Sequence, residues 1–165
     1  IPDAVQNPER GTMKKLNPEY VKAVTTMANG SPYFRHLGMA ITELGVGEAL
    51  VEIGAREAHR QMFGHVHGGV IASLVDTAIF WCFFAELDES SGITTVDLKV
   101  NYLAPVADGK LIARGKRIRL GRTLGLGETE VLNGDGKLIA HGTSSVIVLP
   151  GFGFPGSPKL PPKFL

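Results

Sequence analysis

The feature that most constrains this chain is a long apolar run with a single charge in its middle. Gly68 to Ala85 forms 18 consecutive positions in which Asp76 is the only charged residue. The run reaches the minimum length of a membrane-spanning helix, but a charge at the centre of a bilayer is costly and no Lys or Arg closely flanks either end. A helix that is apolar on all sides fits better inside a folded domain. We therefore expect a buried helix from about Gly68 to Glu86 and no membrane partner.

Strand patterns lie on both sides of this helix. From Met39 onward apolar and polar residues alternate, and Gly45-Val46-Gly47 predicts a turn between two strands. Four further strand candidates follow the helix: Gly92–Leu103, Lys110–Leu120, Thr123–Leu132 and Lys137–Leu149. The short, glycine-containing connections between them predict an antiparallel meander, because parallel neighbours need crossovers of about a dozen residues or more. The expected fold is α+β, a curved antiparallel sheet wrapped around one long helix in the order ββαββββ.

The two ends of the chain differ from this central part. Asn17-Pro18-Glu19 is typical of a helix start, and we expect a short helix from there to Asn29-Gly30. Pro150–Leu165 contains five prolines and three glycines, which predicts an extended arm. The arm carries aromatic residues that could pack on a neighbour, namely Phe152, Phe154 and Phe164. We therefore divide the chain into an N-terminal extension (1–38), one folded domain (39–149) and a C-terminal tail (150–165).

Charge and cysteine content narrow the partners and the location. The net charge of +1 lacks the clustered positive excess of proteins that neutralise many phosphates, so no nucleic-acid partner is expected. The single cysteine, Cys82, excludes an internal disulfide and is interpreted as a small buried hydrophobe. The first residues contain no apolar stretch typical of a signal peptide. We expect a cytoplasmic protein.

A turn rich in glycine and histidine, Gln61 to Gly69, leads directly into the long helix. The amides of Gly68 and Gly69 at the helix start lack intrahelical partners, and the helix dipole adds partial positive charge there. A carbonyl oxygen that turns into an oxyanion would be stabilised at Gly68. The alternative is a plain glycine-rich helix entry. His67 either donates to a reacting group or simply shapes the turn.

Asp76 is the second candidate for chemistry. A carboxylate in an apolar helix is costly to desolvate unless it is paired or lies in a solvated pocket. It could be a general base or a nucleophile, or a structural carboxylate satisfied by Ser73, Thr77 or another chain. Gly68 and Asp76 are eight residues apart, which is about 12 Å along a helix, too far for one carbonyl to contact both. If both serve one substrate, two antiparallel helices of a two-fold dimer should supply them.

Three histidines, His59, His65 and His67, precede or border the helix start. Their spacing on a loop is a weak metal-ligand pattern, and no cysteine or tight ligand cluster completes it. No metal ion is expected.

These features together resemble a known family. His67-Gly68-Gly69 is followed by Asp76, and the stretch Thr95-Val96-Asp97-Leu98-Lys99-Val100-Asn101-Tyr102-Leu103 comes downstream. They resemble hotdog-fold thioesterases of the phenylacetate-degradation (PaaI-like) type, over about Met39 to Leu149. The resemblance implies an enzyme that hydrolyses an acyl- or aryl-coenzyme A thioester and assembles as a dimer or a dimer of dimers.

The resemblance also implies roles for individual residues. The residue at the place of Asp76 is the catalytic carboxylate, and the glycine at the place of Gly68 polarises the thioester carbonyl from the opposite subunit. A residue like Gln61 contacts the carboxylate or the attacking water, and Ser or Thr is common at the place of Thr95. Members divide between Asp and Glu at the carboxylate, so the acyl group stays open.

Substrate contacts are expected outside this centre. Arg119 and Arg122 flank a hairpin where members of the family contact the nucleotide end of coenzyme A, and they could meet its phosphates or be solvated strand-end residues. Phe63 is a candidate for the acyl pocket, although aromatic residues are more often core. Gly69 would let a ligand approach the backbone. No cofactor is implied beyond the coenzyme A of the substrate.

Two other functions remain open on the sequence. A hotdog hydratase or dehydratase also uses a carboxylate and a histidine near the central helix, but Gln61 and the glycine pair after His67 favour hydrolysis. A non-catalytic acyl-coenzyme A-binding module is the other alternative, and Asp76 argues against it because an uncharged residue would cost less to bury.

Overall fold

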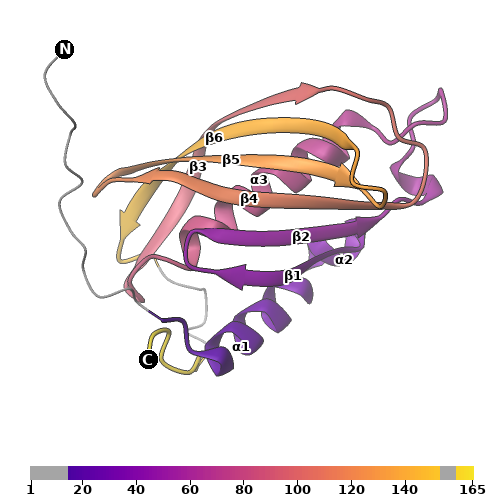
Figure 1. The fold of residues 1–165 in the computed structure, drawn as a ribbon. Helices are drawn as coiled ribbons and strands as arrows, with labels where there is room; N and C mark the ends of the chain where they lie inside the picture. The colour runs from indigo at the N-terminus through magenta and orange to yellow at the C-terminus, as the bar shows by residue number, and fades with distance from the viewer. Residues whose placement is uncertain (1–14, 153–158) are drawn as a thin grey trace, which may run out of the picture.

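The alternating apolar residues of the chain form one antiparallel sheet around the long helix (Figure 1). The structure is a computed structural model that describes residues 15–152 and 159–165. The described strands are β1 (Met39–Gly45), β2 (Glu48–Gly54), β3 (Ser91–Tyr102), β4 (Lys110–Leu120), β5 (Leu124–Asn133) and β6 (Leu138–Pro150), in the spatial order β1-β2-β4-β5-β6-β3. The helices are α1 (Pro18–Asn29), α2 (Pro32–Leu37) and α3 (Gly68–Phe84), and a 3-10 turn, η1 (Glu57–His59), precedes α3. The expected α+β architecture is confirmed.

Glycines on the inner face of the sheet let α3 pack closely against it. A Cβ added at Gly115 of β4 would lie 2.3 Å from the carbonyl oxygen of Ala78. A Cβ added at Gly142 of β6 would lie 2.6 Å from Val75 Cγ1. Protein interiors are close-packed, so a larger residue at either position would force the helix or the strand to move. These glycines therefore set the distance between α3 and the sheet, and with it the position of Asp76.

A bulge in β3 decides which of its side chains reach α3. Val96 is the extra residue, because the register with β6 shifts between Thr95 and Asp97. One extra residue reverses the alternation of the side chains between the two faces of a strand. Thr95 faces α3 before the bulge, and Val100 and Tyr102 face it afterwards. β3 thus sends a polar side chain toward α3 on each side of the bulge, Thr95 before it and Tyr102 after it.

One connection differs from the predicted meander. β4, β5 and β6 follow one another through tight turns, as expected, but β3 pairs with β6 while β4 pairs with β2. Residues 103–109 therefore cross one end of the sheet and do not form a hairpin. Crossing three strand spacings requires about 14 Å, well within the reach of about 23 Å for an extended segment of this length. The Asp108-Gly109 turn only redirects the chain into β4.

Two helices precede β1, of which the sequence predicted the first. α1 begins at Pro18, and the Asn17 side chain accepts the Glu19 N–H at 3.0 Å, as the capping pattern indicated. α2 was not predicted, because its six residues are too few to show a helical period. It ends at Leu37 and is capped by Gly38, whose φ of +63° favours glycine.

The C-terminal residues 159–165 lie against the chain's own α1 and the end of α3. Phe164 forms an isolated β-bridge with Leu16, and the buried Lys163 donates from Nζ to the carbonyl of Phe84, the last residue of α3. Phe164 thus packs on its own chain, whereas Phe152 is exposed. Phe154 lies outside the described residues.

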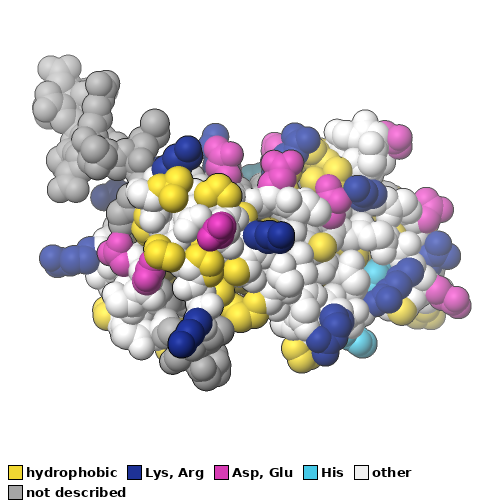
Figure 2. All heavy atoms as spheres, turned by 90° about the horizontal axis from the view of Figure 1, so that it is seen from below, with side chains coloured by type: hydrophobic (Ala, Val, Ile, Leu, Met, Phe, Trp, Pro, Cys, Tyr) yellow, Lys and Arg dark blue, Asp and Glu magenta, His cyan; other side chains and the backbone are white. Residues whose placement is uncertain are grey.

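The surface carries charges of both signs. Figure 2 shows basic and acidic side chains interspersed over one face, with hydrophobic side chains gathered in one half of it. This mixture agrees with the net charge of +1. None of the described helices combines the length and the hydrophobicity needed to cross a membrane.

Candidate active site

Asp76 lies near the middle of α3, on the flank next to β3. Its carboxylate is half-buried, and Thr95 Oγ1 donates to Oδ1 at 2.8 Å. Within residues 15–152 and 159–165, no hydrogen bond reaches Oδ2 and no cation forms an ion pair with the carboxylate. The neutral Thr95 hydroxyl thus orients the carboxylate without neutralising it. One oxygen stays open to accept a proton from water or to attack a carbonyl.

The start of α3 is capped by its own histidine. His67 is the N-cap residue, and its Nδ1 accepts the Gly69 N–H at 2.9 Å. The expectation of two open amides is therefore wrong for Gly69. The Gly68 N–H has no hydrogen-bond partner among the residues that the structure describes. One amide therefore remains open at the positive end of the helix dipole.

Gln61 lies in the loop before α3 and helps to line a cavity of about 340 Å³. Its Oε1 accepts the Phe63 N–H, and its side-chain NH2 group can donate to a ligand. Gly68 and Tyr102 line the same cavity. The cavity thus combines a side-chain donor with the end of α3 that carries the open amide.

Tyr102 is a site residue that the sequence analysis did not single out. It ends β3, and its hydroxyl donates to the carbonyl oxygen of Gly68 at 3.1 Å. Its ring lies close to the same glycine, since a Cβ added at Gly68 would be 3.2 Å from Tyr102 Cζ. The sequence placed Tyr102 in the downstream strand, but the direction of its side chain depends on the bulge at Val96.

A second cavity, of about 370 Å³, lies between α2, η1 and the first turns of α3. Tyr33 and Ser73 meet at its wall with their hydroxyl oxygens 2.6 Å apart. Ser73 Oγ donates to Gly69 O at 2.8 Å, so the proton between the two hydroxyls belongs to Tyr33. His59 is buried at the same cavity, where burial and the Arg56 guanidinium lower its pKa.

The three histidines considered as metal ligands have separate environments. His59 is buried against Arg56, His65 is exposed in the loop, and His67 caps α3. Across the described residues, no group of three or more His, Cys, Asp or Glu is placed to hold a metal ion.

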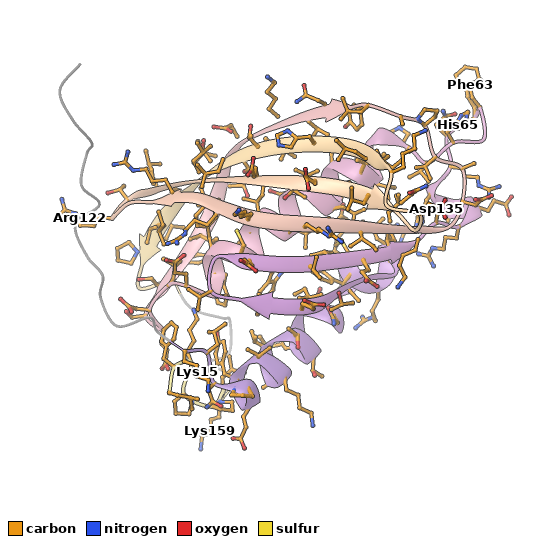
Figure 3. The ribbon with its side chains drawn as sticks, viewed as in Figure 1. Lys15, Phe63, His65, Arg122, Asp135 and Lys159 are labelled. Carbon is orange, nitrogen blue, oxygen red and sulfur yellow. The ribbon has the colours of Figure 1, made fainter. Side chains whose placement is uncertain are left out.

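Of the remaining predicted binding residues, Phe63 lies in the same loop as Gln61, whereas the two arginines lie far from this centre within one chain. Phe63 projects from its loop with 76% of its surface exposed. Arg119 and Arg122 are exposed at the β4–β5 turn. Figure 3 shows Phe63 and His65 at one end of the sheet and Arg122 at the other. A single chain thus brings together Gln61, His67, Gly68 and Gly69, and separately Asp76 and Thr95, but not the two arginines.

Comparison of the sequence with protein families matches residues 63–140 to the family described as the thioesterase superfamily. A Saccharolobus solfataricus protein with a provisional esterase name is 33% identical over 116 residues, which cover 70% of this chain and 82% of that protein. The human protein named acyl-coenzyme A thioesterase 13 is 28% identical over 127 residues, or 75% of this chain and 88% of the relative.

Solved structures agree with the fold. A thioesterase from Haemophilus influenzae superposes with a TM-score of 0.77 at 24% identity, covering 87% of this chain and 99% of that one. A variant of the phenylacetic acid degradation protein PaaI from Thermus thermophilus superposes with a TM-score of 0.66 at 27% identity, covering 71% and 98%. With six antiparallel strands around one central helix and these relatives, the chain belongs to the thioesterase superfamily and has the hotdog fold.

Proposed function

We propose that this chain hydrolyses the thioester of an acyl- or aryl-coenzyme A to the free acid and coenzyme A. The observation that carries the proposal is a carboxylate with one open oxygen, Asp76, on the same helix as the open amide of Gly68. Membership of the thioesterase superfamily supports the reaction class. The likeness to acyl-coenzyme A thioesterase 13 and to the PaaI protein supports the substrate class.

Each polar group has a role in this reaction. The Gly68 N–H donates to the thioester carbonyl oxygen, whose negative charge grows as the carbonyl carbon is attacked. Asp76 either removes a proton from the attacking water or attacks the carbon itself. When water attacks, the carbon–sulfur bond breaks, the free acid forms and the thiolate of coenzyme A takes up the proton that Asp76 removed. When Asp76 attacks, the thiolate leaves first; water then hydrolyses the acyl–aspartate anhydride to the free acid and restores the carboxylate, and a proton of that water ends on the thiolate. His67 presents Nε2 as a donor, because Nδ1 is occupied by Gly69.

The spacing of these groups supports a site made by two protomers. Gly68 and Asp76 are separated by about 12 Å along α3, so one carbonyl cannot touch both in one chain. β3 lies at the edge of the sheet, and no strand of the described residues pairs with its outer side. Exposed apolar side chains lie along β3 and in the segment after it: Val96, Leu98, Tyr102 and Leu103. Exposed edges of this kind are templates for pairing with another chain. We propose a two-fold dimer in which the β3 edges pair antiparallel.

The same two-fold symmetry would bring the distant Arg119 and Arg122 of one protomer toward the site of the other. Antiparallel pairing of the β3 edges turns the partner's sheet end for end. The partner's Arg119 and Arg122 then lie at the end of the assembly that holds the Gln61 loop of the first chain. Guanidinium groups bind phosphates strongly, so these residues are proposed to contact the nucleotide end of coenzyme A.

A panel of short, long and aromatic acyl-coenzyme A substrates tests the function, with released thiol measured by a chromogenic reagent. The protein's own thiol adds little background, because Cys82 is buried and its pKa is raised to about 12 by that burial. We expect thiol release from at least one substrate. Substrate binding without release would instead favour a binding module. Loss of the enoyl absorbance of crotonyl-coenzyme A, without thiol release, would favour a hydratase.

A further inference from the structure

The peptide group between Gly68 and Gly69 is held at both ends. Its carbonyl oxygen, Gly68 O, accepts the Tyr102 hydroxyl at 3.1 Å. Its N–H, that of Gly69, donates to His67 Nδ1 at 2.9 Å. Tyr102 comes from β3, and His67 is the residue that caps α3. A continuous chain of hydrogen bonds thus runs from the tyrosine through one peptide to the imidazole.

This series of hydrogen bonds from Tyr102 to His67 has only one consistent arrangement of protons. The peptide nitrogen is always a donor, so His67 Nδ1 must be an acceptor and the neutral ring must carry its proton on Nε2. The peptide oxygen is always an acceptor, so the Tyr102 hydroxyl must donate. Donation to the oxygen polarises the peptide and strengthens the bond that its N–H makes, because hydrogen bonds in a chain reinforce one another.

We propose that Tyr102 is a positioning residue that acts through the Gly68–Gly69 peptide to hold His67 as the tautomer that donates from Nε2. The hydroxyl also fixes the first peptide plane of α3, and the ring packs on Gly68, whose N–H belongs to the preceding peptide. The catalytic consequence of this inference rests on the proposed thioester hydrolysis, whereas the tautomer does not.

The chain offers a matched control in Tyr33. It is 55% exposed, as against 54% for Tyr102, and its hydroxyl also donates to a group in the first turns of α3. Its acceptor is Ser73 Oγ, which in turn bonds the next carbonyl, that of Gly69. Tyr33→Phe therefore removes a similar hydroxyl without touching the peptide that joins Tyr102 to His67.

The first experiment compares the steady-state kinetics of Tyr102→Phe and Tyr33→Phe on the best thioester of the panel. We expect Tyr102→Phe to lower kcat about fivefold to tenfold, the effect of one neutral hydrogen bond, with KM changed by less than about twofold. Tyr33→Phe should keep kcat within about twofold of the wild type. Equal losses in both variants would mean general loosening of the helix start and would overturn the assignment.

The second experiment needs no activity. The ring nitrogens of His67 are followed by 15N NMR at about pH 8.5, well above the ordinary histidine pKa, and the signals are assigned by their loss in His67→Asn. Wild type and Tyr33→Phe should show the proton on Nε2, and Tyr102→Phe should show a mixture of tautomers. If the wild-type ring carries its proton on Nδ1, or if the tautomer is unchanged in Tyr102→Phe, the proposal is overturned. This holds whatever the activity of Tyr102→Phe in the kinetic assay. Absence of thioester hydrolysis would sink the proposed function and leave this result standing.

Discussion

At the scale of single residues, Asp76 is oriented by Thr95 and remains available for chemistry. Replacing it by Asn keeps the shape and the contact with Thr95 but removes the negative charge that a base or nucleophile needs. We expect Asp76→Asn to lower kcat by at least about a hundredfold and to leave KM nearly unchanged. Asp135→Asn makes the same chemical change in the exposed β5–β6 turn and should keep full activity. Turnover near the wild-type rate in a folded Asp76→Asn would show that the carboxylate has no part in the chemical step.

His59 makes the stability of the helix start depend on pH. Burial and the neighbouring Arg56 lower its pKa in the folded state, so the unfolded chain binds the proton more readily. Its contribution to stability is complete above about pH 6.5, the ordinary histidine pKa, and is lost as the pH falls below that value. We expect Tm to drop between pH 7.5 and pH 5.5, and to drop less in His59→Gln. His65→Gln, on the exposed loop, should retain the wild-type drop. An identical pH dependence in His59→Gln would exclude His59 as the cause.

The residues differ in how far their sequence context could identify them. Asp76 stood out because a lone charge in an apolar helix has few structural explanations. Gly68 could be placed at a helix start, but the loss of the Gly69 amide to His67 depends on a side-chain rotamer that the sequence does not encode locally. Tyr102 could not be identified, because a strand residue after a bulge faces the side opposite to the one that alternation predicts.

At the scale of elements, the packing of α3 on the sheet depends on glycine where the helix crosses β4. A methyl group at Gly115 would meet the backbone of Ala78 at 2.3 Å, and neither backbone can move easily. We expect Gly115→Ala to destabilise the fold by about 1–3 kcal/mol and to lower Tm by several degrees. Gly134→Ala is the control, since the described residues place no atom within 4 Å of an added Cβ there, and it should change stability by about 0.5 kcal/mol or less. Equal Tm values for the two variants would contradict close packing at Gly115.

The elements themselves were largely predictable, whereas the order of the strands was not. The long helix and the strands follow from apolar runs, alternation and turn residues, and these local signals agree with the structure within a few residues. The position of β3 beside β6 is a non-local property. A seven-residue connection serves equally for a loose hairpin or for a crossing of the sheet end, so local pattern could not choose between them.

At the scale of the whole molecule, the proposed site requires two chains. A mixed dimer tests this through the distribution of two inactivating substitutions, the lesions, between its chains. One chain carries Asp76→Asn and its partner carries Gly68→Val, whose side chain would press against Tyr102. In a shared-site dimer, one site then receives an intact Gly68 and an intact Asp76, while the other receives both lesions. We expect about half of the wild-type activity in the purified mixed dimer, although each parent homodimer is nearly inactive.

The reciprocal arrangement makes the test independent of how much either lesion disturbs folding. Placing Asp76→Asn and Gly68→Val together in one chain, with a wild-type partner, puts one lesion into each shared site and should leave the mixed dimer nearly inactive. If each chain instead formed its own complete site, the wild-type partner would retain one working site, and the two arrangements would exchange their activities. The same two substitutions are present in both dimers, so only their distribution between the chains differs. A dimer that is active with the lesions in one chain and inactive with them in two chains would refute the shared site.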